Sequence, residues 1–509
     1  MLRQALRRLV GYTIVLLVVS TCRTVEASGG WTANAAVFAD EIQDLQKALA
    51  IPGLAYAIVE DGRTIATGAF GVEQGSAGSP FTPSTPLRIA SVTKSLTAVV
   101  ALQLVEEGRL DLEAPARRYV PGLKLPDDVR VRHLVTHTSE GIVGAEYVYG
   151  TNRYAMLEDV IEAVTREDFG EVIRRRVLER AEMRAHPSPF LGAHAGLVST
   201  TLDMAASLQA LDRGRLLTKA SLARLETPSR SGAGTPLPVS LGWFAQSVQG
   251  QPVAWSFGQD DPEHSGALLV RVPSRRLSLF LLANANVLSD PFRLLMGDVT
   301  KSPFAMSFLR LFAFSPRGTP LGRPPRDNAA MAERLDAIEA RSAYRYRDEL
   351  LGWMLVDLWN DAGERAQRKY ALARSRYPSE APDPVVHFAA LRLTDARSQD
   401  DAIGDGGRLL AVHPTNRWML LAQGYLLQGR GRAAEASECF QRILDLPNQE
   451  PDFLRRLFLA WSRFALAQMS AERDPQKARA HLEEIVRSGV TGGVLEDARR
   501  LLDSLGPRP

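Results

Sequence analysis

A Ser-x-x-Lys tetrad at the start of a long apolar run is the feature that most restricts how this chain can fold and react. Apolar residues follow the tetrad at steps of three and four: Leu96, Val99, Val100 and Leu104. This spacing predicts a buried amphipathic helix in which Ser91 and Lys94 lie one turn apart. A lysine buried there loses part of its preference for the charged form, and its neutral amine can take the serine proton. The N–H groups at the start of the helix favour negative charge on Ser91.

The alternative interpretation of the tetrad is structural. A serine just before an apolar helical run is commonly an N-cap, and so short a motif recurs by chance in a chain of 509 residues. The chemical interpretation therefore depends on the sequence that surrounds the tetrad.

The composition is that of an ordinary globular protein. Hydrophobic residues make up 45% of the chain and charged residues 23%, which is enough for two or three domains. The formal net charge of +3, without a long basic run, argues against nucleic-acid binding. The sequence has no Cys/His spacing typical of a metal site, and the chemistry of the tetrad needs neither a metal nor an organic cofactor.

The N-terminus has the pattern of a secretory signal peptide. Arginines are followed by an apolar core at residues 13–19, too short to span a bilayer, and by small residues up to Ala27. We expect removal of residues 1–27, export to the periplasm or the medium, and no transmembrane helix in the mature chain. Lipidation at Cys22 is less favoured, because threonine precedes it. Loss of Cys22 with the signal would leave Cys439 alone and exclude an internal disulfide.

The pattern up to residue 300 predicts one antiparallel sheet flanked by helices. The strand Leu54–Val59 runs into an Asp-Gly turn signal and predicts a β-hairpin. Short β-rich runs return later, at residues 241–244, 253–258, 267–272 and 277–283. One hairpin before the helix and several strands after it predict a sheet built from both ends of the domain, which is an α/β (α+β) fold.

Several short segments, taken in order, resemble the serine β-lactamase and penicillin-binding-protein family, in the class C-like branch that also holds esterases and D-aminopeptidases. The matching segments are residues 89–94, 132–139, Tyr149, 196–200 with Asp203, and 241–243. The resemblance covers about residues 45–300 and leads us to place a β-lactamase-like domain at 40–300.

The resemblance implies acyl transfer through a covalent serine ester. Ser91 would attack a carbonyl, Lys94 and Tyr149 would share the general-base work, and water would hydrolyse the acyl-enzyme. Tyr149, beside a charged lysine, would be drawn toward phenolate and pass protons. His137 and His264 are assigned no catalytic role, because a structural and a solvated histidine are the better interpretations.

The second and third motifs of that family are altered here. The second is usually Tyr-x-Asn, and Thr151 takes the third place, so the expected grip on a substrate amide carbonyl is weaker. The third, normally Lys or His, any residue and Gly, is Ser256-Phe257-Gly258, which lacks the cation that binds a substrate carboxylate. Gly258 still permits close approach of a substrate. The resemblance implies an oxyanion hole formed by the N–H groups of Gln259 and Ser91.

These departures favour neutral esters or amides over β-lactams and D-Ala-D-Ala peptides. The favoured function is a serine hydrolase acting through an acyl-enzyme on a small-molecule or peptide ester or amide, as an esterase, peptidase or β-lactamase-like enzyme. The alternative is a catalytically degenerate binding or scaffold protein that recruits a partner through helical repeats. The joint presence of Ser91, Lys94 and Tyr149 favours the enzyme.

Residues 301–330 combine an apolar segment with a linker. Phe304–Phe314 is apolar and either packs on the catalytic domain or touches a membrane, which it is too short to span. The Pro- and Arg-rich residues that follow are typical of a domain boundary.

Residues 331–509 predict an all-α repeat domain. Helical segments with small residues at the crossing recur at intervals of about 34 to 36 residues, at Ala366, Ala402 and Ala436, with an irregular unit at Ala478. This period resembles tetratricopeptide repeats, although Gly406 stands where an aromatic residue is expected; a generic helical bundle is the alternative. Repeats of this kind imply a concave surface for a protein or peptide partner.

Overall fold

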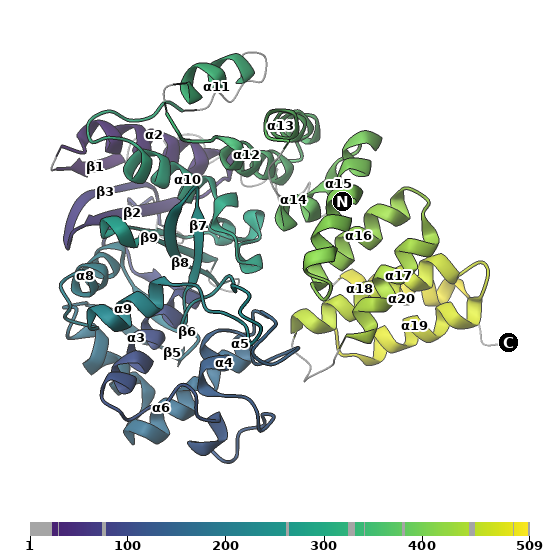
Figure 1. Ribbon diagram of the computed structural model, residues 1–509, viewed down its shortest axis with the longest axis horizontal. Coiled ribbons are helices and arrows are strands. Elements are labelled where there is room, and N and C mark those ends of the chain that lie inside the picture. The colour runs from purple at the N-terminus through teal and green to yellow at the C-terminus, as the bar shows by residue number, and fades with distance from the viewer. Residues whose placement is uncertain are drawn as a thin grey trace. The chain divides into compact units, whose positions relative to one another are not determined.

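The computed structural model describes residues 23–28, 30–73, 78–260, 264–323, 331–340, 342–378, 382–446, 453–491 and 493–506. They form two compact units, Met1–Asn360 and Asp361–Pro509 (Figure 1). Most of the predicted signal peptide, with Cys22, and residues 324–330 of the predicted linker lie outside the described residues.

A seven-stranded antiparallel sheet forms the centre of the first unit, in the order β1-β3-β2-β10-β9-β8-β7. The strands are β1 (Arg23–Ala27), β2 (Gly53–Glu60), β3 (Arg63–Gly71), β7 (Phe244–Val248), β8 (Gln251–Asp260), β9 (Ser265–Val272) and β10 (Leu277–Ala283). β10 pairs with β2 in a register that sets Phe280 opposite Ala57, so the early hairpin joins the late meander. The predicted antiparallel sheet assembled from both ends of the domain is confirmed.

Strand β1 was not expected. Its residues lie inside the segment 1–27 that the sequence predicts as a signal peptide, yet they pair with β3, with Val25 opposite Gly68. Cleavage after Ala27 would therefore remove the edge strand of the sheet.

Helices cover both faces of this sheet (Figure 1). α2 (Thr32–Ala48) and α10 (Pro303–Phe308) lie on one face, and α8 (Thr201–Asp212) and α9 (Lys219–Glu226) on the other. The remaining helices of the unit are α3 (Thr93–Glu106), α4 (Val131–Val135), α5 (Thr151–Ala155), α6 (Leu157–Thr165), α7 (Phe169–Ile173), α11 (Met331–Glu339) and α12 (Arg347–Trp359). A small sheet, β4 (Leu87–Arg88), β6 (Ala195–Ser199) and β5 (His186–Gly192), completes the unit.

Helix α3 is the predicted buried helix after the tetrad. Leu96, Val99 and Leu104 are buried, as the spacing predicted. Polar residues of α3, including Thr97 and Gln103, are buried as well. The helix is therefore enclosed on all sides rather than amphipathic, because it packs between the sheet and the outer helices.

Residues 301–360 belong to the first unit, which corrects the predicted domain boundary at residue 330. The apolar segment forms α10 and a π-helical turn, Leu309–Phe314, and it is buried against the N-terminal helix α2. The ring of Phe312 lies 5.7 Å from that of Phe38 and 5.2 Å from that of Trp31. Of the two alternatives for this segment, packing on the domain that precedes it is therefore the one observed.

A buried ion cluster attaches α12 to the same unit. The Arg310 guanidinium, which is fully buried, donates to Glu41 of α2 and to Glu349 of α12, each at 2.7 Å. Sequence patterns do not reveal such a pairing, because its members are far apart in the chain. The link explains why a helix placed after the predicted linker folds with the first unit.

Replacing Arg310 with methionine is expected to destabilise the first unit by about 3–5 kcal/mol, because two buried carboxylates lose their cation. The matched control is Arg317→Met, which removes a half-exposed partner of Glu60 and is expected to change the free energy of unfolding by about 0–1 kcal/mol. Urea unfolding of the full chain measures both. Equal losses in the two variants would contradict this assignment.

The described residues of the second unit are helical or in short connections. The helices are α13 (Gly363–Arg376), α14 (Pro384–Ala389), α15 (Ala396–Val412), α16 (Arg417–Gly429), α17 (Ala433–Asp445), α18 (Phe453–Ser470), α19 (Pro475–Arg487) and α20 (Gly493–Ser504). The four repeat alanines are all buried, and the predicted all-α region is confirmed. A Cβ on Gly406 would lie 2.0 Å from Gln423 Oε1 and 2.4 Å from the His387 ring, so these two side chains leave no room there for the expected aromatic residue. The assignment to tetratricopeptide repeats stays a prediction.

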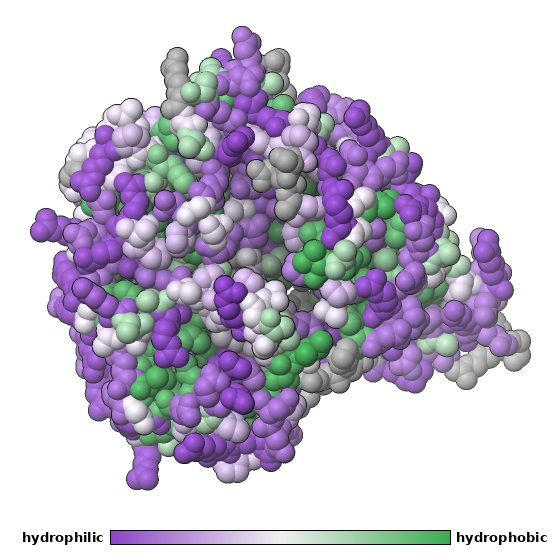
Figure 2. Space-filling model, in the orientation of Figure 1, coloured by the Kyte–Doolittle hydropathy of each residue, from purple (hydrophilic) through white to green (hydrophobic). Residues whose placement is uncertain are grey.

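None of the helices in the described part of the chain combines the length and hydropathy that a membrane span requires. On the face shown in Figure 2, apolar residues occur in groups between hydrophilic ones.

Candidate active site

Ser91 lies in a tight turn at the entrance of α3. The turn, η1 (Ala90–Val92), is a single 3-10 turn, and Ala90 has a φ of 48°, in the left-handed region. Strand β8 runs against this turn: a Cβ on Gly258 would lie 2.3 Å from the carbonyl oxygen of Ile89. Glycine at this position is therefore what lets β8 approach the half-buried Ser91 so closely.

The Lys94 amine lies among three oxygens. Nζ donates to Ser91 Oγ at 2.7 Å, to the Tyr149 hydroxyl at 3.2 Å and to the carbonyl oxygen of His194 at 3.0 Å. Burial lowers the pKa of Lys94 to about 7, because the protein around it solvates the charge less well than water. The predicted one-turn contact with Ser91 is present. At neutral pH much of the amine is uncharged and able to accept the serine proton.

Packing of its ring against a neighbouring histidine ring holds Tyr149 in place. It lies 4.7 Å from the ring of His137, and burial raises the pKa of its hydroxyl to about 12. The expected shift toward phenolate is thus not what the structure gives, because desolvation outweighs the hydrogen bond to Ser91. The Tyr149 hydroxyl keeps its proton at neutral pH and can relay it between neighbouring groups.

His137 is a structural support for that loop. Its ring lies between Tyr149 and Tyr154, at 4.7 and 5.1 Å, and its Nδ1 accepts the backbone N–H of Gly150 at 3.3 Å. Burial, and then the charge of Lys94, lower its pKa to about 3, so the imidazole stays neutral. The surroundings agree with the structural interpretation. His264 is exposed, next to residues 261–263, which lie outside the described residues.

The other predicted site residues are only partly brought together. β7 pairs with residues 251–255 of β8, so Ser256, Gly258 and Gln259 extend past its end, beside the Ser91 turn. Ser256 is buried, and the side-chain oxygen of Gln259 accepts the Ser289 hydroxyl at 3.1 Å. Thr151 begins α5 with its side chain exposed to solvent.

Aromatic rings form one wall of the site. The ring of Phe257 lies 5.5 Å from that of Tyr149, and the ring of Phe244 lies 6.3 Å from Tyr149 and 4.2 Å from Trp255. These rings surround the altered third motif with apolar surface.

The arginine next to the site in sequence does not replace the missing cation of that motif. Arg88 forms an ion pair with Asp260 at 3.4 Å and lies over the exposed Phe190 ring at 5.1 Å. Its charge is therefore balanced within the protein.

Two residues that position Lys94 were not predicted from the sequence. The His194 carbonyl that accepts its amine lies in the two-residue turn of the β5–β6 hairpin, and the Tyr154 hydroxyl donates to the Lys94 carbonyl at 2.8 Å. A backbone acceptor has no side-chain signature. The small residues on both sides of His194 were the available sequence signal, since they allow the turn to approach α3.

Comparisons with known proteins agree with this geometry. The Beta-lactamase family model matches residues 38–295, which is half of the chain. The D-aminopeptidase of Gluconobacter oxydans (strain 621H) is 24% identical over 302 residues, covering 46% of this chain and 56% of that protein. Esterase EstB of Burkholderia gladioli is 38% identical over 88 residues, covering 16% of this chain and 22% of that protein.

Among solved structures, the octameric penicillin-binding protein homologue from Pyrococcus abyssi has a TM-score of 0.47 and 21% identity, over 55% of this chain and 77% of that chain. This chain spans about half the length, or less, of the two curated relatives. The match over half of its length, together with the seven-stranded antiparallel sheet and its flanking helices, shows that the chain belongs to the beta-lactamase family.

Proposed function

We propose that this protein is a serine hydrolase that acts on a neutral ester or amide through an acyl-enzyme. The observation that carries the proposal is the Lys94 amine, with a pKa lowered to about 7, at 2.7 Å from the Ser91 hydroxyl. In the first step Ser91 Oγ bonds to the carbonyl carbon while its proton passes to Lys94 Nζ. The N–H groups of Ser91 and Gln259 are proposed to bind the oxyanion.

The second half of the cycle uses the same groups. Collapse of the tetrahedral intermediate breaks the bond to the alcohol or amine, which takes the proton from Lys94, directly or through Tyr149. Water then attacks the ester on Ser91, its proton passes to Lys94, and the acid is released as Ser91 Oγ regains a proton.

Two observations support neutral substrates: the cation of the family's third motif is missing, and aromatic rings lie beside Tyr149. Ser256 stands where the family has a cation, and Arg88 is paired with Asp260. Rings of Phe257 and Phe244 lie next to Tyr149. The names of the two curated relatives, an aminopeptidase and an esterase, support acyl transfer from amides and esters.

Hydrolysis of p-nitrophenyl butyrate tests the proposal. We expect turnover by the full chain, no turnover above background by Ser91→Ala, and unchanged turnover by Ser84→Ala, which removes an exposed serine. p-Nitrophenyl hemisuccinate, which carries a carboxylate, should react more slowly than the butyrate. Equal rates with Ser91→Ala would instead favour a binding protein with a degenerate site.

Activity should depend on pH through Lys94. The pKa of Lys94 is lowered to about 7, and only the neutral amine accepts a proton. We expect kcat/KM to be constant well above pH 7 and to fall by about tenfold per pH unit well below it. A pH–rate profile corrected for spontaneous ester hydrolysis measures this, and a flat profile from pH 5.5 to 8.5 would exclude Lys94 as the base.

A further inference from the structure

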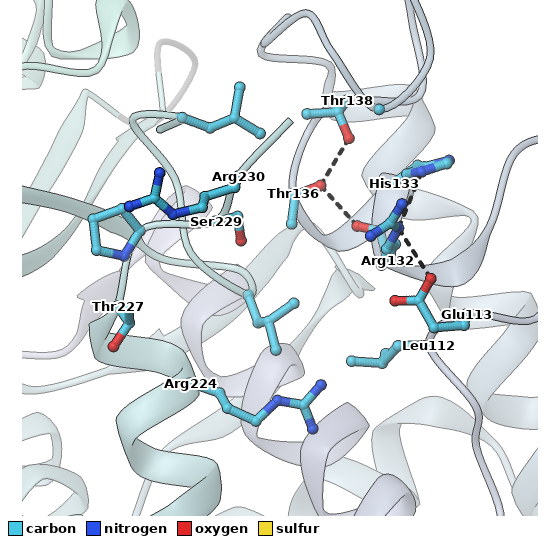
Figure 3. Close-up of a pocket in the computed structure, with 14 residues that line it drawn as sticks. Leu112, Glu113, Arg132, His133, Thr136, Thr138, Arg224, Thr227, Ser229 and Arg230 are labelled. Carbon is cyan, nitrogen blue, oxygen red and sulfur yellow. Dashed lines mark hydrogen bonds and ion pairs between the residues drawn. The ribbon is translucent and has the colours of Figure 1, made fainter. Parts of the chain in front are cut away.

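A cavity of about 280 Å³ lies in the first unit, and its lining does not include Ser91, Lys94 or Tyr149 (Figure 3). One side is formed by α4 and the residues that follow it, and the other by the end of α9 and the segment 227–241. Leucines 112, 237 and 241 contribute apolar surface, while arginines 132, 224 and 230 contribute positive charge.

His133 is an uncharged side chain beside the arginines of this cavity. Burial, with the charges of Arg132 and Arg130, lowers its pKa to about 4, so the imidazole is neutral at pH 7. Nδ1 accepts the backbone N–H of Arg130 at 3.1 Å, in a capping box. The Nε–H of Arg132 points at Nε2 at 3.2 Å, so both ring nitrogens face donors, and a neutral imidazole can accept only one of the two bonds.

The charges around the cavity are not balanced within it. Glu113 is the carboxylate of the lining, and it is shared by Arg130 at 3.1 Å and Arg132 at 3.3 Å. Arg224 has no hydrogen-bond or ion-pair partner within the described part of the chain, and Figure 3 shows it extending toward Leu112. Arg230 donates to the carbonyl of Gly234 at 2.7 Å, which leaves its charge uncompensated.

We propose that this cavity binds a small organic oxyanion, a carboxylate or phosphate on an apolar body, at a regulatory site separate from Ser91. The guanidinium groups would hold the anionic oxygens, and the leucines would contact the apolar part.

The cavity shares a wall with the loop that carries Tyr149. Thr136 and Thr138 line the cavity, and His137 between them accepts the backbone N–H groups of Val148 at 2.9 Å and Gly150 at 3.3 Å. These two bonds flank Tyr149. A bound oxyanion is therefore expected to stabilise the loop and raise the rate of ester hydrolysis, a consequence that rests on the proposed function.

Calorimetric titration of the full chain with hexanoate and with phenyl phosphate tests the site. We expect binding of at least one probe, and the comparison of the two separates a carboxylate site from a phosphate site. Ser91→Ala should leave the Kd unchanged, whereas Arg224→Gln should raise it about tenfold or more. Arg180→Gln, which removes an exposed arginine elsewhere in the unit, is the control and should have no effect.

Absence of binding by both probes would overturn the proposal. So would an equal Kd for Arg224→Gln and Arg180→Gln, or loss of binding in Ser91→Ala. Arg224 is exposed, so Arg224→Gln should keep the thermal midpoint of the full chain, and this is checked first. A bound probe that leaves the rate on p-nitrophenyl butyrate unchanged would overturn the regulatory role, and this outcome is independent of the titration.

Discussion

Replacing Lys94 with methionine is expected to lower kcat/KM for a neutral ester by about 10³-fold, because the variant keeps the shape of the side chain and loses the base. Ser91 Oγ has the Lys94 amine at 2.7 Å, with a pKa lowered to about 7. Steady-state hydrolysis of p-nitrophenyl butyrate measures the loss.

Two further variants separate base catalysis from charge and from folding. Lys94→Arg keeps a cation and hydrogen-bond donors but cannot lose its proton at neutral pH, so it should be as inactive as Lys94→Met. Lys219→Met removes an exposed lysine and should be fully active. Substantial activity in Lys94→Arg would show that the charge, and not the free amine, is what Ser91 needs.

Lys94→Met should also change how stability depends on pH. In the folded protein the pKa of Lys94 is lowered from 10.5 to about 7, so the unfolded chain binds more protons between those values. The penalty for burying the charged amine is fully present below about pH 7 and is relieved as the pH rises toward 10.5. The variant, which has no such penalty, should gain the most thermal stability over the parent below pH 7.

Replacing Gly258 with alanine is expected to lower kcat/KM by about 10²-fold or more, by displacing β8 from the serine turn. The new Cβ would lie 2.3 Å from the Ile89 carbonyl oxygen, a backbone atom that cannot rotate away. Ester hydrolysis and thermal unfolding together measure the effect.

The control for this substitution is Gly122→Ala. A Cβ on Gly122 meets no atom within 4 Å, and activity and stability should both be retained. Full activity of Gly258→Ala would mean that β8 is not required at that distance from Ser91.

The sequence predicted those parts of the site that follow from local spacing. Ser91 and Lys94 come together because they are three residues apart at the start of a helix, and Gly258 matters because only glycine permits the close approach of β8. The sheet was predictable because alternating short strands and turn residues describe it directly.

What the sequence did not reveal depends on contacts between distant segments. The His194 carbonyl that holds Lys94 is a backbone atom, and the high pKa of Tyr149 results from burial by several elements. The domain boundary moved past residue 330 because Arg310 joins Glu41 to Glu349. Pairings of this kind are set by the packed fold and not by spacing along the chain.

Mass spectrometry of the full chain after brief exposure to an activated ester tests the central claim, that Ser91 is an acylated nucleophile, most directly. Acid quenching should preserve a single added acyl group, which peptide mapping should place on Ser91, and Ser91→Ala should add none. Lys94→Met should acylate far more slowly than the parent chain. An unmodified parent chain, or an acyl group on another residue that persists in Ser91→Ala, would contradict the account.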